Sequence, residues 1–260
     1  MKISMLRNVL LLMAAMALSL AAGLPSAQAK PAPKKVADLN QADIGTLTLV
    51  MAAPAGMTRV DGKYPAADEY IKSLEPKFKL RVLAIYADPA EWKSFVEAVA
   101  AHKPASIPRY AMICVPKKMA KKSFTAKTAE KELKRYASWF SFAANNGVVA
   151  KTLTSKGNAK LTEKMGVDIG FKFLTDKFTK KFDDNRNSLS LGARVSFNVF
   201  GQRSEVFLTA TSLQVADKLV FLAYFENSGP DDKMQSIKAN SLNWRDAVAE
   251  ANAVTIVSKQ

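Results

Sequence analysis

Cysteine and histidine are nearly absent from this chain of 260 residues, which contains one of each, Cys114 and His102. A single cysteine excludes an intramolecular disulfide, and the two residues cannot supply the common zinc ligand sets. Any catalytic site that pairs histidine with serine or cysteine would depend on His102. We interpret Cys114, which lies in an apolar run, as a buried core residue. We interpret His102 as a solvated residue at a helix end.

Several motifs that carry known chemistry are missing as well. The chain has no Gly-x-Ser-x-Gly nucleophile elbow, no phosphate-binding loop and no dinucleotide fingerprint. Asp183, Asn185 and Asn187 share the first three ligand spacings of a calcium loop. However, Ser188 replaces the required glycine and Arg194 replaces the final glutamate. We therefore interpret this segment as a polar connection between strands, and we predict neither a metal nor another cofactor.

The N-terminus has the features of a secretory signal peptide over residues 1–29. Lys2 and Arg7 precede the apolar run Val9–Leu24, and Ala27-Gln28-Ala29 resembles a cleavage site. A retained membrane anchor is the alternative, but the run is shorter than the roughly 20 residues that a spanning helix needs. We predict that the mature protein is exported to the periplasm or beyond and has no transmembrane segment. Cleavage removes two cations and no acid, so the net charge falls from +15 to +13.

The remaining residues are numerous enough for one large domain with its own core. Residues 30–42 are rich in proline and lysine and are expected to be flexible. We predict a single α+β domain over 43–255, with a possible subdivision near 147–166.

Alternating and helical periodicities define the expected elements of the first half. Asp88 followed by Pro89 predicts a capped helix start, and Thr125 or Thr128 is expected to cap a long helix. The expected strands cover 46–50, 57–60, 78–86 and 109–115, and the expected helices cover 65–74, 89–101 and about 125–145.

The second half changes to short alternating runs separated by polar breaks, which is typical of an antiparallel meander. A final helix opens at 228–232 and places Met234, Ile237, Ser241, Trp244 and Val248 on one face. The expected strands cover 170–174, 189–191, 193–200, 206–211 and 219–225, with breaks at 201–204 and 216–218. The sequence therefore predicts an α+β fold, an antiparallel β-sheet covered by helices and closed by a C-terminal helix.

The order of these elements resembles the PsbP/Mog1 type of α-β-α sandwich. The resemblance rests on an early strand that leads into Pro54-Ala55-Gly56, and on the late strands 207–211 and 218–225 before the last helix. The region 85–166 departs from that plan because it has too much helix. The resemblance implies an exported accessory or binding protein, and it assigns no functional residue here.

The clearest positive signal is a cluster of cations between residues 117 and 135, opposed only by Glu130 and Glu132. Met119 and Phe124 are interleaved with it. Basic segments with a few apolar residues attach proteins to anionic surfaces, although such a segment can also serve solubility alone. The candidate anion-binding residues are Lys117, Lys118, Lys121, Lys122, Lys127, Lys131, Lys134 and Arg135.

Three functions are compatible with these observations. The first is a non-catalytic exported protein that binds an anionic envelope lipid, an anionic polymer or an acidic protein. The second is a carboxylate-based hydrolase of an envelope polymer, which requires two carboxylates facing each other in a cleft. The third is an assembly or accessory factor with a contiguous exposed apolar patch. The charge and the missing catalytic motifs favour the first function, and the export signal argues against nucleic acid as the partner.

Overall fold

A computed structural model describes residues 40–64, 68, 72, 75–76, 79–101, 103–104, 106, 108–145, 155, 170–174, 179–199 and 202–257. The predicted signal peptide, His102, most of the helix expected at 65–74 and nearly all of 147–166 lie outside these residues. The first strand of the described part begins at Gln41, and its last helix ends at Ala251.

The fold is α+β, as the sequence predicts. The helices are α3 (Pro89–Ala100), α4 (Lys117–Ala120), α5 (Ala126–Asn145) and α7 (Asp231–Ala251). The strands are β1 (Gln41–Ile44), β2 (Leu47–Val50), β3 (Thr58–Arg59), β4 (Leu80–Ala87), β5 (Tyr110–Pro116), β6 (Gly170–Leu174), β7 (Lys180–Asp184), β8 (Ser188–Val199), β9 (Gln202–Val215) and β10 (Lys218–Asn227).

One antiparallel sheet of eight strands organises the molecule, in the order β3-β4-β5-β10-β9-β8-β6, with β7 also paired to β8. Strands β8, β9 and β10 form the predicted meander. Strands β6 and β7 pair with successive parts of β8 on the same edge. Strands β1 and β2 form a separate hairpin.

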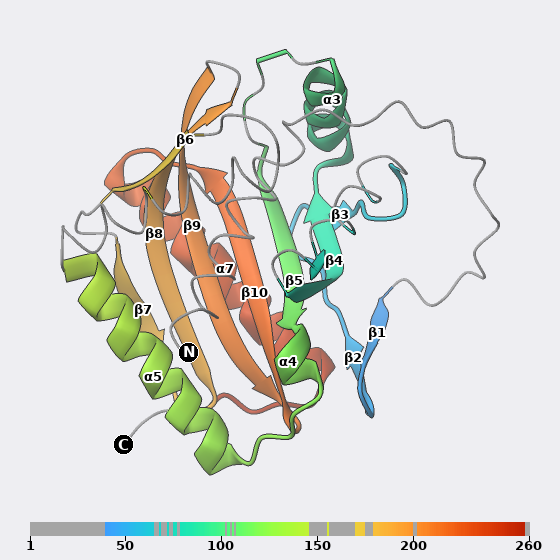
Figure 1. Ribbon diagram of the computed structural model, residues 1–260, viewed down its shortest axis with the longest axis vertical. Coiled ribbons are helices and arrows are strands. Elements are labelled where there is room, and N and C mark those ends of the chain that lie inside the picture. Colours follow the sequence, from blue (N-terminus) through green and yellow to red (C-terminus); the bar gives the residue numbers. More distant parts are fainter. Residues whose placement is uncertain are drawn as a thin grey trace.

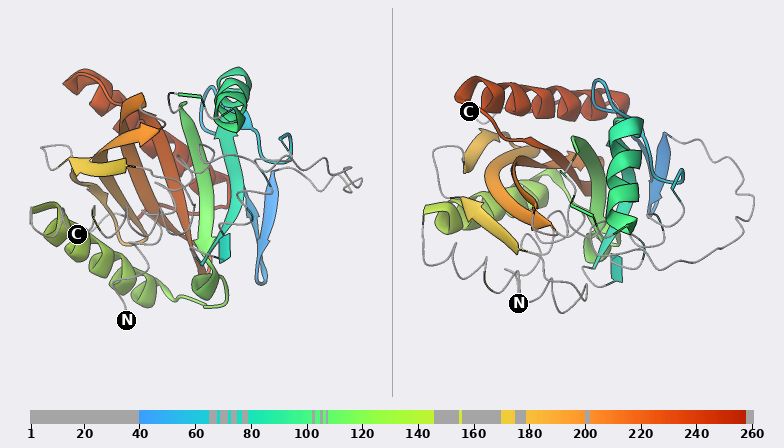
Figure 2. Two further views of the ribbon diagram at one scale, coloured as in Figure 1. Left: turned by 45° about the horizontal axis from the view of Figure 1, so that its top comes forward. Right: turned by 90° about the horizontal axis from the view of Figure 1, so that it is seen from above.

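Helices cover both faces of this sheet (Figures 1 and 2). Helix α7 lies along one face, where Trp244 packs against Tyr224 of β10 at a ring separation of 6.5 Å. Helix α5 lies on the other face, where Tyr136 approaches Phe221 at 6.0 Å. Because Phe221 and Tyr224 are three positions apart on β10, their side chains point to opposite faces.

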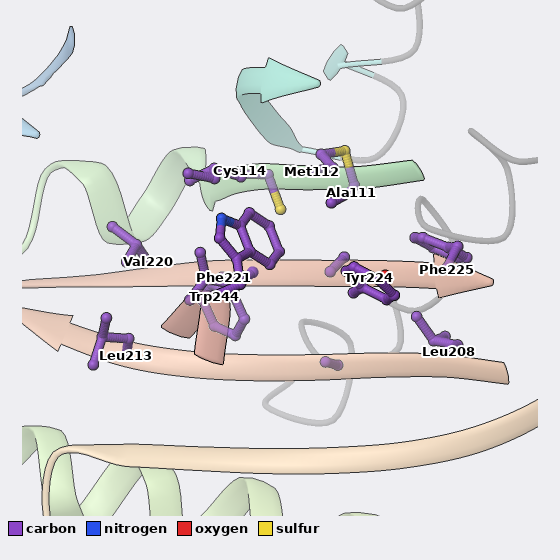
Figure 3. Close-up of a cluster of buried hydrophobic side chains, with 14 of the residues drawn as sticks. Ala111, Met112, Cys114, Leu208, Leu213, Val220, Phe221, Tyr224, Phe225 and Trp244 are labelled. Atoms are coloured by element: carbon purple, nitrogen blue, oxygen red, sulfur yellow. The ribbon is translucent and has the colours of Figure 1, made fainter. Parts of the chain in front are cut away.

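The core is centred on β5 and β10, the neighbouring strands in the middle of the sheet (Figure 3). All seven residues of β5 are buried, as are the first eight residues of β10. Tyr110 stacks on Phe225 with ring centroids 4.3 Å apart, and Trp92 of α3 packs against Tyr110 at 5.9 Å. Burial on both faces explains why these runs, apart from Lys218, are apolar without strict alternation.

The local signals at the helix starts are confirmed for α3 and α5. The Asp88 carboxylate accepts hydrogen bonds from the backbone N–H groups of Ala90 and Glu91 at 2.9 and 3.0 Å. Thr125 accepts one from the N–H of Thr128 at 3.3 Å. Helix α7 differs, because it begins after Pro230 without a side-chain cap. Its predicted apolar face is nevertheless buried on the sheet.

Several predicted boundaries are wrong in the meander. The runs expected at 189–191 and 193–200 belong to one strand, β8, since its alternation continues through Gly192. The break expected at 201–204 is too long, because Gln202 and Ser204 already pair with β8. Strand β9 continues to Val215, four residues beyond its predicted end. Polar residues in the last part of this strand, such as Ser212 and Gln214, resemble a turn in sequence while they pair with β10.

A part-buried ion pair joins α7 to the end of β7. Arg245 donates to the Asp183 carboxylate at 2.5 Å, and its side chain is 8% exposed. Asn185 also donates to Asp183, at 2.9 Å. Residues 185–187 of the segment with partial calcium-loop spacing form the expected connection between β7 and β8, whereas Asp183 belongs to β7 and its carboxylate is bound by Arg245.

Cys114 lies at the centre of β5 and is fully buried, as predicted. Burial raises the pKa of its thiol to about 12, and the nearby charge of Glu75 adds to this shift. Because the thiolate is the reactive form, the thiol stays protonated throughout the neutral range.

We therefore predict that a thiol-specific reagent at pH 8 leaves the native protein unmodified and modifies one thiol per chain once denaturant unfolds it. Mass spectrometry of both samples measures this. Rapid labelling of the native protein, at the rate of a free thiol peptide, would contradict the burial of Cys114.

Candidate anion-binding surface

The eight candidate cations lie together on α4, on the turn that follows it and on the first half of α5. We call these residues the basic surface. Lys117 and Lys118 belong to α4, while Lys121 and Lys122 follow it, and all four are exposed. Lys127, Lys131 and Lys134 are exposed on α5, and Arg135 is half-buried. The structure thus places one sequence cluster at one end of the molecule (Figure 1).

Three of these cations have acidic partners. Lys134 Nζ lies 2.9 Å from Glu130 Oε1, Arg135 pairs with Glu132, and Lys117 lies 3.9 Å from Glu75. Such exposed pairs contribute little to stability, typically about 0–1 kcal/mol each. The structure gives no ion pair with any described residue for the other five, which are Lys118, Lys121, Lys122, Lys127 and Lys131.

Lys131 is the most crowded of these cations. Its neighbours one helical turn away are Lys127, Lys134 and Arg135, at positions i−4, i+3 and i+4. Like charges at these spacings destabilise a helix by roughly 0.2–0.5 kcal/mol per pair. Lys134 and Arg135 are paired with acids, so the uncompensated repulsion is the one between Lys127 and Lys131. A bound anion would relieve it.

The apolar residues of the segment do not contribute to this surface. Met119 and Phe124 are 4% and 8% exposed, and Met119 receives a hydrogen bond from the Tyr136 hydroxyl at 3.6 Å. Both side chains hold α4 and the following turn to the core. The sequence suggested that they accompany the lysines at an interface; instead, the basic surface acts through charge.

A buried lysine fixes the turn between α4 and α5. Lys218, at the start of β10, donates to the carbonyl oxygen of Lys122 at 3.0 Å and lies 3.2 Å from Asp217. Hydrogen bonds from Ser123 and from Lys218 lower the pKa of Asp217, so its carboxylate is ionised at neutral pH. These contacts hold Lys121 and Lys122 in one place although their own side chains are exposed.

Two hollows lined by described residues are large enough to hold a small molecule. One, of about 610 Å³, lies beside α3, and Glu91 is the charged residue in its lining. The other, of about 450 Å³, lies at the start of α5, where Lys127, Glu130 and Arg186 line it. Each of these two linings contains a single acid. Neither hollow therefore offers the two facing carboxylates that a hydrolase needs.

Neither a metal cluster nor a spanning helix is found in the described part of the chain. No three acidic, histidine or cysteine side chains there gather as metal ligands. No helix among the described residues is both long and apolar enough to cross a bilayer.

The large exposed apolar side chains of the described residues are Phe142 and Val257. Val257 lies near Lys127, whereas Phe142 lies about 22 Å farther along α5, so the two form no contiguous patch.

Sequence reasoning missed Arg186, which the β7–β8 turn brings to the start of α5 beside Lys127. The two residues are 59 positions apart in sequence, and no local pattern signals their proximity.

The phenylalanine-rich stretch at 171–182 also contains lysines that could extend the basic surface. There Phe182 is half-buried, and the Lys238 ammonium lies 5.6 Å from its ring centroid; the side chains of Phe171 and Phe173 lie outside the described part of the structure.

Comparisons of this chain with protein-family models, with curated proteins and with solved structures give no match. The resemblance to the PsbP/Mog1 type of sandwich therefore stays a prediction. The site must be interpreted from its own geometry.

The crowding at Lys131 predicts an increase in stability when its charge is removed. Lys131→Gln relieves the repulsion with Lys127, whose charge has no acidic partner among the described residues, whereas Lys134 and Arg135 are paired with acids. It should raise the free energy of unfolding by about 0.2–0.5 kcal/mol. Lys134→Gln is the matched control on the same helix, because it also removes the ion pair with Glu130. Urea titration measures both variants. A loss of stability in Lys131→Gln would show that this lysine serves the fold.

Proposed function

We propose that this is an exported, non-catalytic protein whose basic surface binds an anionic component of the cell envelope, with anionic lipid headgroups as the first candidate. The observation that carries the proposal is the set of five exposed cations without an acidic partner among the described residues. Two of them, Lys127 and Lys131, lie one helical turn apart on α5 and repel each other, and the five charges together favour an anionic partner.

The geometry supports attachment to a surface through charge. The cations come from two helices and the turn between them, and the turn is fixed by Lys218. Each lysine near an anionic membrane contributes about 1 kcal/mol of binding free energy. Since Met119 and Phe124 are buried, no apolar side chain of this segment inserts, and binding should weaken steeply as salt is added.

Export rests on the signal-peptide pattern at residues 1–29. Export would bring the protein to a compartment where anionic lipids and polymers are available as partners. It argues against nucleic acid as the partner.

The direct test is co-sedimentation of residues 30–260 with anionic and neutral lipid vesicles over a salt series. We expect binding to anionic vesicles alone, weakened by salt. The triple variant Lys118→Gln, Lys121→Gln, Lys122→Gln should bind about 100-fold more weakly, because three contributions of about 1 kcal/mol are lost.

The matched control removes the same number of charges on and next to α3, with Lys63→Gln, Lys93→Gln and Lys103→Gln. Helix α3 lies at the other end of the molecule from α4 (Figure 1). It should retain most of the binding. Equal losses in both triple variants would show that net charge alone attracts the protein. Absence of vesicle binding at low salt, with retention on an acidic polymer or protein, would overturn the lipid assignment.

A further inference from the structure

The hollow at the start of α5 combines cationic and apolar walls. It measures about 450 Å³, which is within the usual range of small-molecule sites. Lys127 and Arg186 are among the residues that line it, and Val254 and Val257 from the segment after α7 supply apolar surface. We call it the α5 hollow.

Hydrogen bonds between distant segments build the walls of this hollow. The backbone N–H of Arg186 donates to the carbonyl of Val257 at 2.8 Å, and the N–H of Val257 donates to the Asn187 side chain at 3.0 Å. The Asn187 amide in turn donates to the carbonyl of Thr255 at 2.7 Å. The C-terminal segment is thus bound to the β7–β8 turn, so the hollow exists before any ligand arrives.

Hydrogen bonds of Gln214 fix the wall of the hollow that is formed by the start of α5. The backbone N–H of Gln214 donates to the carbonyl of Asn187 at 2.8 Å, and its side-chain amide donates to the carbonyl of Phe124 at 3.3 Å. Phe124 lies two residues before the start of α5 at Ala126. The start of this helix is therefore held at a set position against the β7–β8 turn.

The two cations of the hollow have no ion pair with a described residue, and part of its apolar surface is open to solvent. Lys127 and Arg186 are exposed, and neither has an ion pair with a residue that the structure describes. The acid in the lining, Glu130, pairs with Lys134 at 2.9 Å. Val257 is 42% exposed and is one of the two large apolar side chains that the described residues leave open to solvent. A ligand that suits both features has an anionic head and an apolar chain.

We propose that the α5 hollow binds a single anionic amphiphile, with the head between Lys127 and Arg186 and the first part of its chain against Val254 and Val257. This inference rests on the proposed function, because Lys127 belongs to the basic surface. It adds that the ligand is recognised as one molecule, by its head and its chain together, and not by surface charge alone.

The test uses dodecyl phosphate below its critical micelle concentration as the probe, with inorganic phosphate beside it. Titration followed by NMR should shift the methyl signals of Val254 and Val257. Dodecyl phosphate should bind at least 10-fold more tightly than inorganic phosphate, because burial of several methylene groups is favourable. Equal affinity for the two probes would overturn the inference.

Two variants examine the two halves of the site. Lys127→Gln with Arg186→Gln should weaken dodecyl phosphate binding about 10-fold, and Val254→Ser with Val257→Ser about 5-fold or more. Phe142→Ser is the control for apolar surface, since this exposed residue lies at the far end of α5. Unchanged affinity in the valine variant, with unchanged thermal melting, would contradict the assignment.

The same samples separate this inference from the proposed function. The triple variant at Lys118, Lys121 and Lys122 should lose vesicle binding and retain dodecyl phosphate. Vesicle binding without any binding of dodecyl phosphate would overturn the amphiphile site and leave the proposed function standing. If the valine variant also weakens vesicle binding, the amphiphile is a membrane lipid; if vesicle binding is unchanged, the amphiphile is a free molecule.

Discussion

Burial of β5 and β10 on both faces is the constraint on which the rest of this structure depends. These central strands are apolar over almost their whole length, so each face of the sheet must be covered by a helix. Trp244 of α7 and Tyr136 of α5 meet opposite faces of β10. Because the apolar side of α5 packs against the core, the cations of this helix lie on its solvent side, where they form part of the basic surface.

The polar contacts around this core set the positions of the surface elements. Lys218 begins β10 and at the same time holds the turn after α4 through the carbonyl of Lys122. Asn187 joins the β7–β8 turn to the C-terminal segment. Such contacts are worth about 1 kcal/mol each, which is small beside the core, but they decide where Lys121, Lys122 and Arg186 lie relative to α5. The basic surface and the α5 hollow are thus arranged by the same strands that form the core.

Local chemistry made much of the fold predictable. The apolar spacing of α7 from Met234 to Val248 and the Asp88 cap of α3 both depend on neighbours within a few turns, and both are confirmed. The pairing of β10 with β5 was not predictable, because the two strands are far apart in sequence, whereas the pairing of β10 with β9 follows from the short turn between them. The candidate site shows the same division. The cations of 117–135 are contiguous in sequence, whereas Arg186 and Val257 join Lys127 only through the sheet turns and the C-terminal segment.

The most direct test of the basic surface is to map which face of the protein meets an anionic bilayer. Amide chemical shifts recorded with and without anionic lipid nanodiscs would locate that face. We predict that the changes concentrate on α4, the turn after it and the first half of α5, and that they disappear with neutral nanodiscs. Changes centred on α3 or on the outer side of α7, with α5 unaffected, would contradict a role for the basic surface in binding.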